Sequence, residues 1–359
     1  MRIGLLAPLA YPIPPRGYGG TERVVASLAD GLSRRGHTVT LFASGDSRCA
    51  ARLRTCLPHA LGNGPGSAAR QALWEGLLAR EAVASARELD ILHDHTKSAG
   101  IQAATLADCP VLTTVHNALT PKREAVYSRH LGHPLVALSQ AHARTMQGFS
   151  VVEVVPNGVP LPVCPRPQTK DSYLLFLGRL DAPKGADWAA RLAARYDLPL
   201  VMAGRVANDD DFFATCVAPW LNGGRRRYVG EVDGEVKWQL LAGARALLFP
   251  IRWAEPFGLV MVEAMAVGTP VVAFGRGAVP EVVEDGVTGR ILPSEADEPA
   301  WRQALMEVRQ LDPQAARTRV AHLFSEDAMV ERYLKLYQRL IAAPQELMSR
   351  TAAGGPPPP

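Results

Sequence analysis

The stretch Glu255-Pro-Phe-Gly-Leu-Val-Met-Val-Glu263 is the densest motif of the chain. The apolar run 244–250 before it is typical of a buried strand, and residues 260–267 after it favour a helix. Gly258 therefore lies where a helix begins, and a helix N-terminus offers unpaired N–H groups and a positive dipole end to a phosphate. We expect a pyrophosphate over this helix start, with Glu255 and Glu263 reaching hydroxyl groups on either side. An ordinary strand-to-helix turn with two solvated acids fits the same spacing.

The two acids resemble the E-x7-E motif of the retaining glycosyltransferases of family 4, which have the GT-B fold. The resemblance extends to the neighbouring segments Pro256-Phe-Gly-Leu259, Glu263-Ala-Met-Ala266, Gly268-Thr-Pro-Val-Val272, Pro280-Glu-Val-Val283 and Asp285-Gly-Val-Thr-Gly289. It implies an α/β fold of two Rossmann-like domains, with parallel sheets that face each other across a central cleft.

Composition excludes several classes of protein. At 359 residues, 47% of them hydrophobic, the chain can build two domains, and a net charge of +4 does not indicate a nucleic-acid partner. The five cysteines show no metal-binding spacing and fit reduced thiols of a cytosolic protein. No apolar run approaches the roughly 20 residues of a membrane span. Prolines interrupt the apolar start, which favours a first strand over a signal peptide. We therefore expect a cytoplasmic protein, associated with a membrane only if its acceptor is a lipid.

The first half of the chain opens like a Rossmann domain. The expected elements are a strand over 2–7, a glycine loop, a helix over 22–35 capped by Thr21, and a strand over 38–43. A nicotinamide-binding protein would need an acid after the second strand, and Asp46 is the candidate, but the loop is not a clean G-x-G-x-x-G. The resemblance to family 4 instead implies that Gly19 and Gly20 lie near the donor phosphates.

Histidines accompany two further expected strands, over 90–93 and 111–115. Polar side chains at the carboxyl ends of parallel strands point toward a ligand crevice. His93 and His95 could mimic a metal pair, but no third ligand is apparent and we expect no metal site. Thr114-Val-His-Asn117 resembles the setting in which family 4 enzymes place a histidine beside the reacting sugar, which implies that role for His116. A structural histidine is the alternative.

The second half begins with a strand over 172–177 and the sequence Gly178-Arg-Leu-Asp181. Arg179 can fork onto phosphate oxygens and Lys184 can add a point charge, although a charged, solvated loop fits as well. Both residues resemble the diphosphate-binding pair of family 4. The expected layout is a first, acceptor-side domain at 1–160, a linker at 161–171, a nucleotide-sugar-binding domain at 172–325, a helix crossing back to the first domain at 326–345, and a disordered tail at 346–359.

The resemblance implies transfer of a hexosyl unit from a nucleotide-diphosphate sugar to a hydroxyl of a small-molecule, saccharide or lipid-linked acceptor, with retention and with no cofactor or metal. The residues it assigns to catalysis are Glu255, His116, Arg179 and Lys184. Those it assigns to donor binding are Gly19, Gly20, Arg179, Lys184, Gly230, Val232, Phe257, Gly258, Leu259 and Glu263. Uridine is the first expectation for the base and guanosine the second. Acceptor choice is expected in loops around residues 11–18, 49–66 and 120–129.

Other functions remain open on the sequence. A sugar-nucleotide 2-epimerase shares the fold, and a non-catalytic protein could bind the same sugar nucleotide. A glucan phosphorylase would need a lysine for pyridoxal phosphate, and none is convincing. The segments Pro14-Pro-Arg-Gly-Tyr-Gly-Gly-Thr-Glu-Arg-Val-Val25 and Leu41-Phe-Ala-Ser-Gly-Asp-Ser47 resemble a bacterial subgroup of family 4 that includes a transferase of oligosaccharide-antibiotic assembly.

Overall fold

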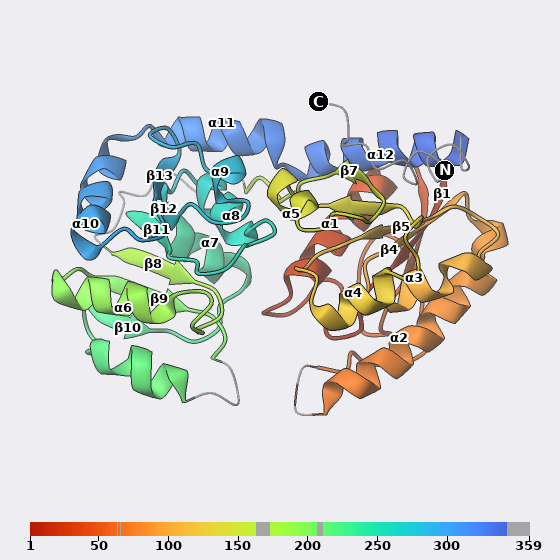
Figure 1. Cartoon of the computed structure of the whole chain (residues 1–359), viewed down its shortest axis with the longest axis horizontal. Helices are drawn as coiled ribbons and strands as arrows, with labels where there is room; N and C mark the ends of the chain where they lie inside the picture. The colour runs from red at the N-terminus through yellow and green to blue at the C-terminus, as the bar shows by residue number, and fades with distance from the viewer. Residues whose placement is uncertain (63, 65, 163–172, 207–210, 343–359) are drawn as a thin grey trace. The chain divides into compact units, whose positions relative to one another are not determined.

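The computed structural model describes residues 1–62, 64, 66–162, 173–206 and 211–342 (Figure 1). It divides into two compact units, one made of Met1–Gly158 with the segment that begins at Glu326, the other of Val159–Ser325. Most of the expected linker and all of the expected tail lie outside the described residues. None of the described helices has the length and hydropathy that crossing a membrane requires.

The first unit is built on a seven-stranded parallel sheet in the order β3-β2-β1-β4-β5-β6-β7. Its strands are β1 (Arg2–Leu6), β2 (Thr38–Phe42), β3 (Arg52–Arg54), β4 (Ile91–Asp94), β5 (Val111–Thr114), β6 (Leu135–Ala137) and β7 (Val151–Val154). Its helices are α1 (Gly20–Arg34), α2 (Ser67–Ala84), α3 (Ala99–Ala103), α4 (Pro121–Tyr127), α5 (Gln140–Arg144) and α12 (Glu326–Ala342). Most of these strands are rich in apolar residues, as expected for a parallel sheet that helices cover on its faces; the edge strand β3 is the exception.

The second unit, Val159–Ser325, has a six-stranded parallel sheet in the order β10-β9-β8-β11-β12-β13. Its strands are β8 (Leu174–Leu177), β9 (Leu200–Ala203), β10 (Arg226–Tyr228), β11 (Ala246–Phe249), β12 (Val271–Phe274) and β13 (Gly289–Leu292). Its helices are α6 (Ala186–Arg195), α7 (Gly234–Gly243), α8 (Leu259–Ala266), α9 (Val279–Val282), α10 (Glu298–Glu307) and α11 (Pro313–Leu323). One core cluster joins Phe176, Leu248 and Trp301, which is fully buried.

Helix α12 completes the first unit from the far end of the described chain, and Figure 1 shows it beside α1. Gly31 of α1 makes room for Val330, because a Cβ at position 31 would lie 2.6 Å from the Val330 side chain. Arg35 of the first unit also forms an ion pair with Asp327, at 2.7 Å. The helix therefore packs as part of the first unit although it follows the second in sequence.

Both sheets reverse their strand order at an equivalent place. The chain moves outward from β1 to β3 and then returns to add β4 on the other side of β1, and it repeats this pattern from β8 to β10 and β11. In open α/β sheets, ligands bind outside the carboxyl ends of the strands at such a switch point. The loops after β1 and β4, and those after β8 and β11, are therefore the first places to look for a site.

Most of the expected strands are confirmed, with differences at charged segments and helix ends. β3 and α4 lie in segments expected to be loops, because Arg-Leu-Arg and Pro-Lys-Arg-Glu carry almost no apolar pattern. The expected N-cap Thr21 is wrong: α1 begins at Gly20, and Gly19 precedes it with a φ of 149° and no side-chain cap. The alanine-rich stretch 68–89 favours a single helix, but α2 ends at Ala84 and a short 3₁₀ turn follows. Serine is a favoured N-cap residue, and Ser139 caps α5, since its hydroxyl accepts from the His142 N–H.

Candidate active site

The loops after β8 and β11 meet at the switch point of the second sheet, where these two strands pair in parallel. The backbone N–H of Arg252 donates to the carbonyl of Pro183 at 2.9 Å. Gly185, with a φ of 72°, permits this approach, because a Cβ there would lie only 2.1 Å from the carbonyl oxygen of Pro250. The two loops are therefore held in direct contact.

An ion pair between Lys184 and Glu255 joins these loops. Nζ of Lys184 lies 2.5 Å from Oε2 of Glu255, and the two side chains are 19% and 11% exposed. The same ammonium group lies 5.4 Å from the ring centroid of Trp253 and 5.8 Å from that of Phe249, within cation–π range. The structure thus brings together a predicted cation and a predicted acid at the switch point.

Helix α8 starts next to this pair. Its N-cap is Gly258, with a φ of 83°, and no side chain caps it, so the first N–H groups lack an intrahelical partner. A Cβ on Gly258 would lie 3.5 Å from Cγ of Glu255 and 2.6 Å from the end of Met261. An ammonium group and a positive helix end therefore flank one short segment, and both favour an anion.

Arg179 lies at the end of β8. Its guanidinium forms an ion pair with Asp181 at 2.8 Å and is 43% exposed. Asp181 also accepts from the backbone N–H of Lys184 at 3.0 Å, so one carboxylate holds the side chain of Arg179 and the backbone at Lys184. Nε of Arg179 is buried and has no hydrogen-bond partner among the described residues. The guanidinium therefore keeps donors for a ligand.

Glu263 is paired with a residue that the sequence did not single out. Nζ of Lys237 donates to Oε1 of Glu263 at 2.7 Å, and the side chains are only 9% and 11% exposed. Lys237 comes from α7, and its ammonium lies 5.1 Å from the ring centroid of Trp238. The lysine fixes the carboxylate in one orientation. No local sequence pattern indicates a role for Lys237, because the sequence of α7 is that of an ordinary helix.

Four further predicted donor residues, Phe257, Leu259, Gly230 and Val232, lie on the same unit. Phe257 is 2% exposed and packs edge-on against Phe324, so its backbone is the part that can meet a donor. Leu259 is the first residue of α8. Gly230 follows β10, and its carbonyl accepts from the N–H of Gly204 at 2.9 Å; Val232 comes shortly after it. The described structure shows no hydrogen bond from Gly230 or Val232 to the Lys184–Glu255 pair.

In the first unit, Gly19 and Gly20 begin α1 at the switch point. A Cβ on Gly19 would lie 2.8 Å from Pro15 and 3.1 Å from a carboxylate oxygen of Glu22. Glu22 is 5% exposed, and its burial raises its pKa to about 7, with Lys97 acting in the opposite direction. The glycine loop therefore ends beside a buried acid.

His116 follows β5 and lies beside His95, which follows β4. Nε2 of His116 is 2.9 Å from Nδ1 of His95. Burial lowers the pKa of His116 to about 3, with His142 as a further cause, and holds the pKa of His95 well below its ordinary value. Both rings are therefore neutral near pH 7, and one donates to the other. Nε2 of His95 is buried without a partner among the described residues.

His93 is satisfied by the fold. Its Nδ1 lies 2.7 Å from the hydroxyl of Tyr337 on α12, and its Nε2 lies 2.7 Å from Oγ1 of Thr114. Oγ1 of Thr114 in turn lies 2.8 Å from the hydroxyl of Tyr333, also on α12. The ring centroids of His93 and His95 are 3.9 Å apart, so the network reaches from α12 to the histidine pair at the strand ends.

Asp94, at the end of β4, is a buried acid that the sequence did not single out as a site residue. It accepts from the N–H and Oγ1 of Thr96 at 2.8 and 2.7 Å and from Oγ1 of Thr113 at 3.0 Å. Gly100 leaves room for it, since a Cβ there would lie 2.0 Å from Cγ of Asp94. Burial raises its pKa to about 7.

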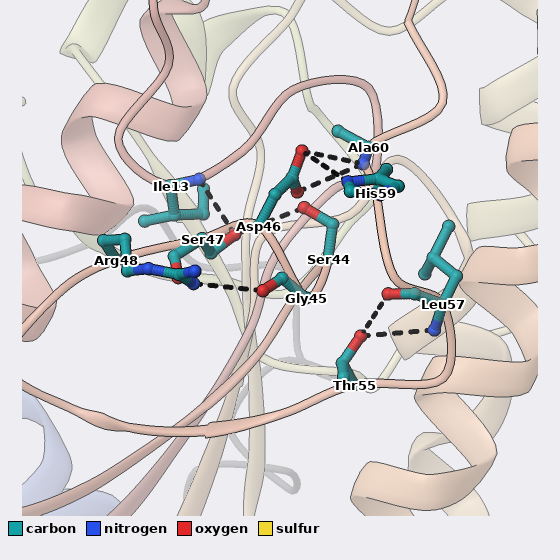
Figure 2. Close-up of polar contacts among 10 residues, drawn as sticks. All are labelled: Ile13, Ser44, Gly45, Asp46, Ser47, Arg48, Thr55, Leu57, His59 and Ala60. Carbon is teal, nitrogen blue, oxygen red and sulfur yellow. Dashed lines mark hydrogen bonds and ion pairs between the residues drawn. The ribbon is translucent and has the colours of Figure 1, made fainter.

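Asp46, the candidate for a nicotinamide ribose, is used by the fold instead. Figure 2 shows its carboxylate turned toward Ala60 and His59. It accepts from the N–H of Ala60 at 3.1 Å and lies 3.8 Å from Nδ1 of His59. Ser47, next to it, accepts from the N–H of Ile13 at 3.0 Å. These contacts tie the loop after β2 to its neighbours and disfavour a nicotinamide site.

A metal site has no support among the residues that the structure describes. No group of three or more His, Cys, Asp or Glu side chains there is arranged to hold an ion.

Two family models match the chain. One, described as "Glycosyltransferase Family 4", matches residues 18–162, and the other, described as "Glycosyl transferases group 1", matches residues 165–320. Between them they span most of both sheets and contain every predicted site residue. The chain belongs to glycosyltransferase family 4.

The relatives of this glycosyltransferase agree with that assignment. Phosphatidyl-myo-inositol mannosyltransferase of Mycobacterium tuberculosis is 28% identical over 332 residues, which is 82% of each protein. The solved structure of AviGT4, a glycosyltransferase involved in avilamycin A biosynthesis, has a TM-score of 0.72 at 25% identity and covers 95% of this chain and 98% of its own. HepE of Anabaena in complex with UDP has a TM-score of 0.72 at 19% identity, and the match covers 95% of this chain and 100% of HepE. At this identity the similarity shows the fold alone. The predicted GT-B fold is confirmed.

The glycosyltransferase therefore has two sets of predicted residues, each at a switch point. In the second unit, Lys184 and Glu255 contact each other directly, and Glu263 is held by Lys237. In the first unit, His116 is paired with His95. The partners Lys237 and His95 come from other elements of the chain, which is why spacing in the sequence did not reveal the pairs.

Proposed function

We propose that this glycosyltransferase moves a hexosyl unit from a nucleotide-diphosphate sugar to an acceptor hydroxyl, with retention at the anomeric carbon. The observation that carries the proposal is the Lys184–Glu255 ion pair beside the uncapped start of α8. A diphosphate needs cations and N–H donors, and a sugar hydroxyl needs an acceptor. This one place offers all three.

The second unit would bind the donor. Arg179 and Lys184 would bind the diphosphate and stabilise the charge that develops as it leaves, with the N–H groups of α8 as further donors. Glu255 would accept from a sugar hydroxyl, and Glu263, oriented by Lys237, from the ribose hydroxyls. Because these cations are fixed before the donor arrives, they would stabilise the leaving group without large rearrangement.

The first unit would contribute His116. Its imidazole is neutral, because burial lowers its pKa to about 3, and its Nε2 is engaged by His95. A neutral ring can hydrogen-bond a sugar hydroxyl, and we propose the hydroxyl at the 6-position as its partner. Gly19 and Gly20 would bring backbone close to the donor phosphates.

No protein nucleophile, resident metal or cofactor is part of this proposal. The departing phosphate oxygen would take the proton from the acceptor hydroxyl as that hydroxyl attacks the same face of the sugar. The bond from the anomeric carbon to the phosphate oxygen breaks, and a bond to the acceptor oxygen forms. Uridine is the proposed base, with guanosine second; HepE shows that the fold can hold UDP.

Calorimetric titration with UDP, GDP, ADP and dTDP, with and without Mg²⁺, tests the donor site. We expect one nucleotide to bind without Mg²⁺, and Arg179→Gln to weaken it by about tenfold because it loses charge-assisted hydrogen bonds. Arg195→Gln is the matched control: it also removes an arginine that is paired with an acid, but at the C-terminal end of α6. Absence of binding for all four nucleotides would refute the proposal. An equal loss in Arg195→Gln would refute the site.

The stereochemistry and the reaction class are tested on the product. The donor for this test is a nucleotide-diphosphate sugar that carries the base identified by the titration. Proton NMR of the product should show that the transferred sugar keeps the anomeric configuration that it had in the donor. Inversion would contradict the retaining mechanism. Conversion of the donor sugar to its 2-epimer, with no transfer, would establish the epimerase instead.

A further inference from the structure

A pocket in the first unit is not used by the proposed donor chemistry. Its volume is about 650 Å³, and its walls come from α2, from α3 with the loop before it, and from the start of α4. These elements all belong to the first unit, so the pocket is defined within one compact body. Its size suits a small organic molecule or the head of a larger one.

The walls carry an excess of positive charge. Four basic side chains line the pocket from three different elements, namely Arg80, Lys97, Lys122 and Arg123. Arg80, Lys97 and Lys122 are exposed, and among the described residues no hydrogen bond or close ion pair involves the charged end of any of these three side chains. Several exposed arginines elsewhere are paired with an acid, as Arg87 is with Asp108 at 2.6 Å. Unpaired cations around a concave surface attract an anion.

The one acidic residue in the lining does not neutralise this charge. Glu75 of α2 is 5% exposed, and one of its carboxylate oxygens accepts from the N–H of Leu9 at 3.1 Å. Its partner is therefore the loop after β1 and not a lysine at the mouth. Arg123 is also oriented, since its guanidinium donates to the carbonyl of Ala118 at 3.0 Å.

The rest of the lining is uncharged: it combines small and apolar residues, among them alanines from α2 and α3, with polar side chains from Gln71, Ser98, Gln102 and Thr120. A bare inorganic ion would leave these walls unused. An organic molecule that carries a phosphate fits both features, because lysine ammonium groups bind phosphate as point charges and apolar walls accept the carbon skeleton.

Glu75 connects the pocket to the switch point. It lines the pocket and accepts from the N–H of Leu9 at 3.1 Å, and the loop that contains Leu9 leads to Gly19 and Gly20. A ligand whose phosphate lies among the cations would therefore extend toward Gly19 and Gly20. We infer that this pocket binds the phosphate of a phosphorylated acceptor and directs a hydroxyl of that acceptor to the site of transfer. The role as acceptor site rests on the proposed function, whereas phosphate binding does not.

The test uses the full chain and a double variant, Arg80→Gln with Lys122→Gln. Both residues are exposed, neither is in the proposed donor site, and so the variant should fold and bind nucleotide as the wild type does. The matched control is Arg87→Gln with Arg129→Gln, which removes the same charge from exposed positions outside the pocket. The soluble probe is glycerol 3-phosphate, measured by calorimetry. The lipid probe is a phosphatidylcholine vesicle containing about one fifth phosphatidic acid, measured by co-sedimentation.

We expect the pocket variant to bind at least one probe about tenfold more weakly than the wild type, and the control variant to bind as the wild type does. Loss on vesicles alone assigns the pocket to a lipid phosphate, and loss with glycerol 3-phosphate assigns it to a soluble one. Equal loss in both variants, or no binding of either probe by the wild type, overturns the inference. A protein that binds phosphate here but binds no nucleotide would refute the proposed transfer while leaving the pocket assignment intact.

Discussion

The two units share a strand order but stabilise their buried polar groups differently. In the second unit, buried acids are paired with lysines: Glu255 with Lys184 and Glu263 with Lys237. In the first unit, the buried groups near the strand ends favour their neutral forms, since burial lowers the pKa of the histidines and raises that of Asp94 to about 7.

The difference follows from what each unit is proposed to bind. A diphosphate carries several negative charges, so a site for it needs cations that are already fixed, and these cations need acids to hold them. A sugar hydroxyl is neutral, and a neutral imidazole is a suitable partner. Similar strand frameworks therefore support charged groups at the strand ends of one unit and largely neutral groups at the strand ends of the other.

The difference between the units is tested most directly at the buried ion pair between Lys237 and Glu263. Lys237→Met should lower the free energy of unfolding by about 3–5 kcal/mol, because it leaves the carboxylate of Glu263 buried without its partner. Urea unfolding measures this. Replacing both partners, Lys237→Met with Glu263→Leu, should recover most of the loss, since no uncompensated charge remains.

The matched control is Lys335→Met on α12. Lys335 also pairs with a glutamate at 2.8 Å, but it is 72% exposed, so its loss should cost less than about 0.5 kcal/mol. If Lys237→Met costs no more than Lys335→Met, buried charge pairing does not distinguish the second unit.

The sequence predicts local features of this molecule well. The apolar run predicted as a strand over 172–177 is one, and the structure has the strand Leu174–Leu177 there. The donor residues Glu255, Gly258 and Glu263 lie in one stretch, so a single motif contains them. Each of these predictions depends on residues that are close in the chain.

The contacts that the sequence did not reveal are those between distant elements. Lys237 meets Glu263 only because α7 packs against α8, and His95 meets His116 only because β4 and β5 are neighbours in the sheet. The pocket in the first unit depends on α4, whose charged sequence gives no apolar period. The position of Asp46 after a strand fits a ligand-binding acid, but its contacts with His59 and Ala60, shown in Figure 2, occupy it, and no pattern in the sequence indicates them.

The neutral character of the first unit predicts a pH dependence. Burial lowers the pKa of His142 to about 4 from its ordinary 6.5, so between these values the unfolded chain binds more protons than the folded one. The stability from this group is therefore present above pH 6.5 and is lost as the pH falls toward 4. His142→Asn should remove about 2 kcal/mol of the difference in unfolding free energy between about pH 7 and pH 4.5.

Buried acids of the same unit act in the opposite direction. The pKa values of Asp94 and Glu22 are raised to about 7, so their contribution to stability falls as the pH rises toward 7. Because Asp94 and Glu22 are present in both proteins, their contribution cancels when the pH dependence of the variant is compared with that of the wild type. His322→Asn, at an exposed position of the second unit, is the control and should leave the pH dependence unchanged. If the unfolding free energy of His142→Asn changes with pH as steeply as that of the wild type, the prediction is wrong.

The smallest expected effect concerns the glycine that starts α8. Gly258→Ala should lower the free energy of unfolding by about 1–2 kcal/mol, because its φ of 83° disfavours a side chain and the new Cβ would meet the end of Met261 at 2.6 Å. Gly36→Ala separates these causes, since Gly36 has a φ of 79° and nothing within 4 Å of a Cβ. The difference between the stability losses of the two variants measures the contact with Met261 alone. It should be small because the end of a methionine side chain can move.

In a nucleotide titration, Gly258→Ala should also weaken binding while Gly36→Ala does not, since only Gly258 begins the helix over which the diphosphate is proposed to lie. Equal nucleotide affinity in the two variants would show that the start of α8 does not contact the donor.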